Sequence, residues 1–241
     1  MKDKDMDEAL ERAAQVPHRV DPALLAAVGD SIKSSMRPVR PLPPAWMLSG
    51  GLILISASIA IAGAARAGFH GFEKLDFLQR ALIFSALGIL LWAAAQEFVD
   101  QMIPGSRHRI APRALLQAST VSLLGVFALL FRDYRTTHFL SAGVVCLLTG
   151  LLHAVPAGLV SWWLLRRGFA VNAIAAGLVG GTLGGLAGVT MLELHCDNFQ
   201  AFHIILWHTA VVPLSGAVGA LLAWAIRSWA DSGALDQAVP K

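Results

Sequence analysis

Six long runs of apolar residues, separated by short polar stretches, make up most of the sequence. Each run has at least 18 residues, the length an α-helix needs to cross roughly 30 Å of hydrocarbon. The predicted spans cover residues 46–65, 78–98, 114–131, 139–165, 169–194 and 202–226. We therefore predict an all-α fold, a polytopic bundle of six transmembrane helices.

The first 43 residues are polar and contain one shorter helical pattern. Asp21-Pro22 is typical of a helix start, because a carboxylate caps the first turn and proline fits the first helical position. Arg37-Pro38 ends the pattern, because proline disfavours the helical conformation at the residue that precedes it. The predicted amphipathic helix carries an apolar stripe, which consists of Leu24, Leu25, Val28, Ile32 and Met36.

This stripe has nothing in its own segment to bury it, so we expect it to contact either a membrane surface or a partner protein. Acidic and basic residues are equal in number over residues 1–43, seven of each, which is a poor match to an anionic lipid surface. We favour a cytoplasmic partner that takes the helix in an apolar groove.

The distribution of Lys and Arg predicts the orientation of the spans. Fourteen basic residues lie on the side of the two termini and five on the opposite side. Because basic residues concentrate in cytoplasmic segments, we expect both termini in the cytoplasm. The expected parts are a cytoplasmic binding segment with a proline-rich spacer (1–45), a transmembrane domain (46–226) and a cytoplasmic tail (227–241).

Composition supports a membrane protein and excludes an ordinary soluble domain. The chain is 56% hydrophobic and 15% charged, whereas soluble domains carry about a quarter charged residues. No glycine loop for phosphates, no Ser/His/Asp arrangement and no HExxH motif is present, so we expect no enzyme. The acidic residues Glu97 and Glu193 lie at predicted span ends, which disfavours a proton-coupled transporter.

Glycine recurs at spacings of three and four in the fifth span, which gives one helix face a smooth surface. The residues are Gly177, Gly180, Gly181, Gly184, Gly185 and Gly188. Such a face favours either tight helix packing or a sliding surface used in signalling, and both interpretations stay open.

Sulfur and imidazole side chains gather around the short loop between the fifth and sixth spans. His195, Cys196, His203 and His208 lie in or beside this loop, and Cys146 lies in the same outer half of the fourth span. One interpretation is a transition-metal site, with the first four as candidate ligands. A second is a disulfide between the two cysteines, and a third is ordinary packing of these side chains.

Two stretches of the sequence resemble the NrsF-type membrane anti-sigma factors, which are negative regulators of extracytoplasmic-function (ECF) sigma factors. The first is Leu192–Asn198 followed by His203-Ile-Ile-Leu-Trp207-His208, and the second is Cys146, Pro156 and Trp162–Gly168. The resemblance extends over essentially the whole chain and is densest between Cys146 and His208.

This resemblance implies a multi-pass protein of the bacterial inner membrane that holds an ECF sigma factor through its amino-terminal segment, without touching nucleic acid itself. It also implies that Cys146 and Cys196 are sensing thiols for heavy metals or oxidants, while Asp197 stands where the family usually has proline. The alternative is a membrane metal- or redox-cofactor protein, an enzyme subunit or metal carrier, that uses the outer His/Cys cluster. A transition metal ion is the one cofactor that either function suggests, and the oligomeric state stays open.

Overall fold

The computed structural model describes residues 11, 21–35, 43–103, 105–106, 109–167, 170 and 172–238. The chain divides into two compact units, Met1–Leu42 and Pro43–Lys241, and each is described by itself. Met36, the last residue of the predicted stripe, lies outside the described residues.

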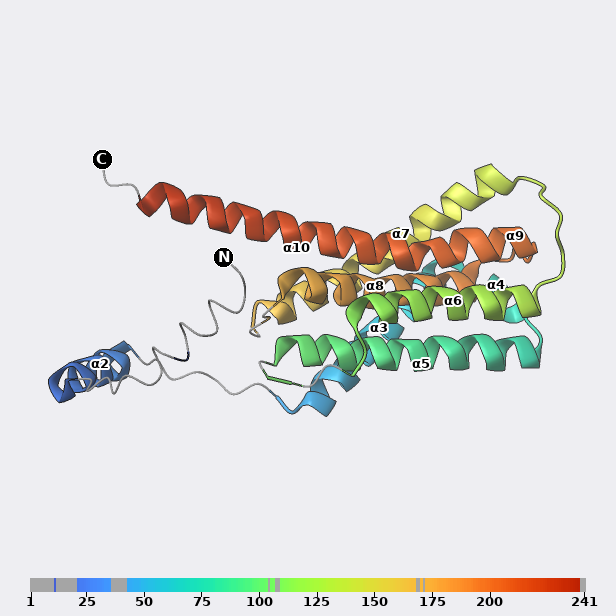
Figure 1. The fold of residues 1–241 in the computed structure, drawn as a ribbon. Coiled ribbons are helices and arrows are strands. Elements are labelled where there is room, and N and C mark those ends of the chain that lie inside the picture. Colours follow the sequence, from blue (N-terminus) through green and yellow to red (C-terminus); the bar gives the residue numbers. More distant parts are fainter. Residues whose placement is uncertain are drawn as a thin grey trace. The chain divides into compact units, whose positions relative to one another are not determined.

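The second unit is a helix bundle, and the described residues contain no strand longer than an isolated bridge (Figure 1). Its helices are α3 (Ala45–Ala67), α4 (His70–Lys74), α5 (Phe77–Met102), α6 (Pro112–Leu130), α7 (Phe139–Leu165), α8 (Ala173–His195), α9 (Ala201–His203), the π-helical turn η1 (Ile204–His208) and α10 (Thr209–Ala238). Six helical segments are long and apolar enough to cross a membrane, the last being the continuous run Ala201–Trp229. The predicted six-helix, all-α fold is confirmed, with ends that differ from the predicted ones by a few residues.

Local sequence signals set several helix ends. Asp76 caps α5: its side chain accepts a hydrogen bond from the Gln79 backbone at 2.8 Å, and the Gln79 side chain accepts one from the Asp76 backbone at 3.0 Å. Proline opens α6 at Pro112, where its missing N–H has no helical partner to lose. The short helix α4 fills the connection between α3 and α5.

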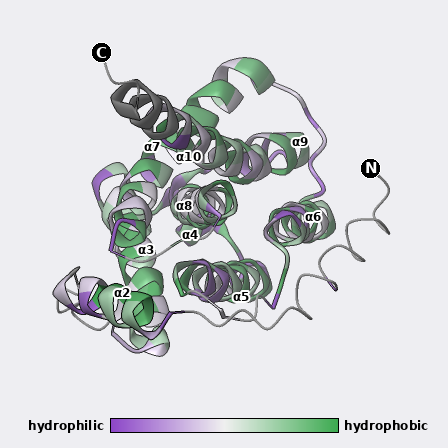
Figure 2. Ribbon diagram, turned by 60° about the vertical axis from the view of Figure 1, so that its left-hand side comes forward, coloured by the Kyte–Doolittle hydropathy of each residue, from purple (hydrophilic) through white to green (hydrophobic). Residues whose placement is uncertain are grey.

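Helix α8 is the centre of the bundle, surrounded by the other long helices (Figure 2). In its most apolar window 72% of residues are buried, against 22–44% in the other five spans. Glycine permits this burial, because a Cβ on Gly184 would lie 2.8 Å from the Ala154 carbonyl oxygen, and one on Gly185 would lie 2.8 Å from Val212 Cα. Close packing therefore accounts for the glycine pattern of the predicted fifth span.

The first unit contains α2 (Pro22–Ser35), whose start is capped as predicted: the Asp21 carboxylate accepts a hydrogen bond from the Ala23 backbone at 2.9 Å. The described stripe residues Leu24, Leu25, Val28 and Ile32 are between 48% and 58% exposed. The apolar face of α2 is thus only half covered within its own unit.

Candidate functional site

Four metal-binding side chains meet at one end of the bundle. They are Cys146 on α7, Cys196 immediately after α8, His203 on α9 and His208 at the end of η1, and their ligand atoms all lie within 4.8 Å of one another. The Cys196 sulfur lies 3.6 Å from the Cys146 sulfur and 3.6 Å from His203 Nε2. Both cysteines are free thiols. We call these four residues the donor cluster.

Packing of α7 against α8 brings the two cysteines together, although they are 50 residues apart in sequence. A Cβ on Gly150 would lie 2.9 Å from Leu192 Cδ1, so the two helices approach closely at this level. Cys146 lies one turn before Gly150, and Cys196 lies one turn after Leu192. Because the helices are antiparallel, both one-turn steps lead toward the same end of the bundle.

The π-helical turn η1 brings the two histidines together. In a regular α-helix, residues five apart differ by about 140° around the axis, so His203 and His208 would point in different directions. The wider turn between Ile204 and His208 removes much of that difference, and the imidazole centroids lie 5.3 Å apart. Pro213 follows in α10 without the N–H that a regular helix would direct at the Thr209 carbonyl, which weakens α-helical geometry here.

A buried carboxylate orients His208. Glu193 Oε1 lies 2.6 Å from His208 Nδ1, and both side chains are 2% exposed. His208 Nε2 is buried and has no hydrogen-bond partner among the described residues, so it is the nitrogen left for a ligand. Carboxylate–imidazole pairs of this kind fix the ring of a metal-binding histidine. Sequence reasoning missed Glu193 because it placed this residue at a span end, whereas the structure buries it.

The structure places His195 outside the donor cluster. Its Nδ1 lies 3.1 Å from the Gly68 carbonyl oxygen, and its ring packs beside His70 with the centroids 6.1 Å apart. Of the predicted ligands, Cys196, His203 and His208 therefore come together, and the fourth donor is Cys146 instead of His195.

The dimensions of the donor cluster fit a tetrahedral metal ion. Zinc binds sulfur at about 2.3 Å and nitrogen at about 2.0 Å, so the donors of a tetrahedral site lie roughly 3.3–3.8 Å apart. The two contacts of Cys196 are both 3.6 Å, all pairs of ligand atoms lie within 4.8 Å, and the unsatisfied His208 Nε2 belongs to the same group. Two thiols and two imidazoles favour a soft or borderline ion over Mg²⁺ or Ca²⁺, which prefer oxygen.

The electrostatics around Cys196 favour the neutral thiol in the absence of an ion. The neighbouring Cys146 sulfur and burial raise the pKa of Cys196. Metal binding therefore has to displace a proton from this sulfur, as it does at most thiolate sites.

The outer rim of the donor cluster is formed by α4 and the loop after α8. Lys74 Nζ forms an ion pair with Asp197 Oδ2 at 2.9 Å, which lowers the pKa of Asp197. Gly71 lies so close to the end of α8 that a Cβ there would be 2.6 Å from the Cys196 carbonyl oxygen and 2.7 Å from that of Glu193. Helix α4 therefore covers the end of the site with backbone in direct contact.

The fold and the donor cluster define a helical protein with six helices of membrane-spanning length among the described residues and a thiol–imidazole cluster at one end of the bundle. The chain matches the family described as NrsF, negative regulator of sigma F, over residues 33–229, and it belongs to that family. It is thus a negative regulator whose partner is a sigma factor. The matched region contains the six-helix bundle through Trp229 and only the last residues of α2. Comparison with curated proteins and with solved structures finds no match.

Proposed function

We propose that this chain is an anti-sigma factor of the bacterial inner membrane, with both termini in the cytoplasm. It holds an ECF sigma factor through its amino-terminal segment and releases it when the donor cluster responds to a heavy-metal or redox signal. The six apolar helices and the excess of basic residues beside the termini support the membrane location and orientation.

The half-exposed apolar stripe of α2 is the observation that supports the amino-terminal segment as the binding segment. Leu24, Leu25, Val28 and Ile32 together leave a continuous apolar surface on a helix of 14 residues. Full burial of each such side chain contributes about 1.5–3 kcal/mol. Even partial burial of the stripe in a partner's groove would therefore contribute several kcal/mol to the binding free energy. Met36, which lies outside the described residues, is added to the proposed binding surface from the sequence pattern alone.

The donor cluster supports the sensory half of the proposal. A metal ion held by Cys146, Cys196, His203 and His208 would join α7, the end of α8 and the start of the last span. An ion that binds one arrangement of these helices more tightly than another shifts the population between them. An oxidant could instead remove two electrons and two protons from the thiols and join them, but that reaction leaves the two histidines and Glu193 without a role. We therefore favour the metal ion.

The test is a pull-down from detergent extract of the native host, with residues 1–43 present or deleted. We expect a sigma factor to be recovered with the full chain and lost with the deletion, while both forms stay in the membrane fraction. Recovery of equal amounts with the deleted form would contradict the assignment of the binding segment, and a soluble full chain would contradict the membrane location.

A second candidate, a membrane metal carrier or cofactor-binding subunit, is favoured by the donor cluster itself, with three donors buried and Cys146 partly buried. The two functions differ in what the metal does. In the regulator, addition of the metal lowers the amount of sigma factor retained by the full chain, whereas in a carrier the metal binds and the retained amount is unchanged.

A further inference from the structure

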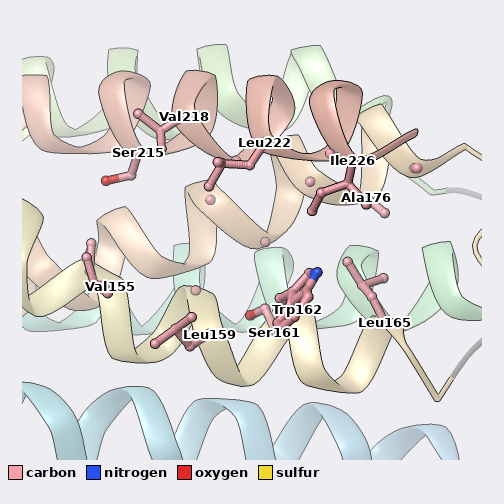
Figure 3. A pocket seen from close by; sticks show the side chains of 18 of the residues that line it. Val155, Leu159, Ser161, Trp162, Leu165, Ala176, Ser215, Val218, Leu222 and Ile226 are labelled. Carbon is pink, nitrogen blue, oxygen red and sulfur yellow. The ribbon is translucent and has the colours of Figure 1, made fainter. Parts of the chain in front are cut away.

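A deep groove lies between α7, α8 and α10, at the opposite end of α8 from the donor cluster. Its cavity volume is about 800 Å³, within the roughly 300–1,000 Å³ typical of sites for small molecules. Figure 3 shows side chains of α10, such as Val218 and Leu222, on one side and side chains of α7, such as Val155 and Leu159, on the other. Gly177 and Gly181 of α8 line the groove between these two sides, while their backbone packs closely against α10.

The groove is apolar along its length and basic at one end. Among the described residues that line it, none is acidic, and the two charged ones are Arg166 at the end of α7 and Arg227 on α10. The Arg166 guanidinium lies over the Trp162 ring, 5.1 Å from its centroid, which keeps both side chains at this end. An occupant of matching chemistry therefore has a long apolar body and an anionic group at one end.

One buried polar atom also belongs to this groove. Ser215 lines it from α10, is 9% exposed and has no hydrogen-bond partner for its buried hydroxyl among the described residues. The other serine of the lining, Ser161, donates to the Ala157 carbonyl oxygen at 2.9 Å and so satisfies its own hydroxyl. Because both hydroxyls are buried, the surface that an occupant would contact is apolar except at the basic end.

The length of the groove corresponds to one leaflet of a bilayer. The lining contributed by α7 and its C-cap runs from Leu151 to Arg166, a rise of about 22 Å at 1.5 Å per residue. A bilayer with its headgroup regions is roughly 40–45 Å thick, so one leaflet measures about 20–22 Å. When the arginines lie at headgroup level, the apolar part of the groove lies at the level of the acyl chains.

We propose that the groove binds one anionic glycerophospholipid, with an acyl chain along α8 and the phosphate between Arg166 and Arg227. Basic sites between transmembrane helices bind lipid headgroups in this way. The inference rests on the membrane location proposed above. A helix from a second copy of the chain would match the apolar part of the groove but not its basic end, so a lipid with an anionic headgroup matches more of the groove.

Native mass spectrometry of the full chain, delipidated in detergent and titrated with phosphatidylglycerol or phosphatidylcholine of equal chain length, tests this proposal. The double variant Arg166→Gln/Arg227→Gln removes the basic end, and Arg113→Gln/Arg132→Gln removes the same charge outside the groove. We expect the first variant to bind phosphatidylglycerol about tenfold more weakly and to lose the preference over phosphatidylcholine. The control variant keeps both the affinity and the preference.

A second variant, Val218→Trp, fills the groove without changing charge and should also displace the bound lipid. Thermal unfolding of each variant in detergent verifies that the bundle is intact. Equal phosphatidylglycerol binding by wild type and the Arg166/Arg227 variant would overturn the proposal. So would a purified dimer that retains no lipid and that Val218→Trp converts to a monomer, because the occupant would then be a second copy. Neither result would bear on sigma-factor retention or membrane location, which the pull-down and the membrane fractionation test separately.

Discussion

The two halves of α8 differ in how their surroundings cover them. From Thr182 to Val189 every residue is buried, and the helix continues into the buried Glu193 and the donor cluster. Toward its start, Gly177 and Gly181 are only partly buried: α10 packs against them, and the groove lies beside them toward α7. Glycine therefore lets α10 pack closely against both halves of α8, and the groove forms where α7 and α10 stand apart.

This contrast shows how one helix serves two kinds of chemistry. The closed half is buried, so a hydrogen bond there is made in a low dielectric, and so would be a bond to a metal ion. The open half offers shape and apolar surface, with charge only at its mouth. The following predictions test this division, from the largest expected effect to the smallest.

The closed half depends on the absence of a side chain at Gly188. In Gly188→Ala the new Cβ would overlap the Gly150 carbonyl oxygen of α7, a backbone atom that can move only with its helix. We expect the free energy of unfolding in detergent to fall by about 3 kcal/mol or more. Gly125→Ala in α6 is the matched control, because nothing lies within 4 Å of a Cβ there. An unchanged stability of Gly188→Ala would show that α7 and α8 are farther apart than described.

Loss of one donor should weaken metal binding strongly. For Cys196→Ser or His208→Ala we expect zinc affinity, measured by competition with a chromophoric chelator, to fall at least a hundredfold, since a four-donor site loses a ligand. His195→Ala is the control and should keep wild-type affinity, because His195 bonds toward Gly68 instead of the donor cluster. If His195→Ala weakens binding as much as His208→Ala, the ligand set predicted from sequence is the correct one.

The carboxylate behind His208 should matter less than a donor itself. For Glu193→Gln we expect a loss of ten- to a hundredfold in zinc affinity, the range found for groups that orient a metal-binding histidine. Glu97→Gln changes another buried carboxyl, also 2% exposed, outside the donor cluster and serves as the control. Equal affinity of both variants would mean that Glu193 does not orient the ring.

The six spans could be predicted from sequence because each apolar run is long enough to specify a helix without knowledge of its neighbours. The donor cluster could be predicted only in part. Its two histidines are five residues apart, and nothing in the pattern showed that a π-helical turn would align them. His195 and Cys196 are adjacent in sequence, but α8 ends between them. His195 therefore contacts Gly68, whereas Cys196 contacts His203. The pairing of Glu193 with His208 depends on the packing of α8 against the last span.

The smallest effect is expected at the rim. Lys74 and Asp197 form an ion pair whose side chains are 55% and 60% exposed, so Asp197→Asn should lower the free energy of unfolding by less than about 1 kcal/mol. Zinc affinity should stay within about twofold of wild type, and added salt should erase the stability difference. A larger loss of affinity would place Asp197 among the groups that act on the donor cluster.

The most direct test of the central claim is the amount of sigma factor that co-purifies with the chain when the α2 stripe carries charge. The variant Val28→Asp/Ile32→Asp places two carboxylates in the apolar face, and Ala23→Asp/Ser34→Asp places the same charges on the opposite face of the helix. We predict that the amount of co-purified sigma factor falls at least tenfold for the stripe variant and stays at the wild-type level for the control. Both variants should be present in equal amounts in the membrane fraction. Retention by the stripe variant at the wild-type level would contradict the account.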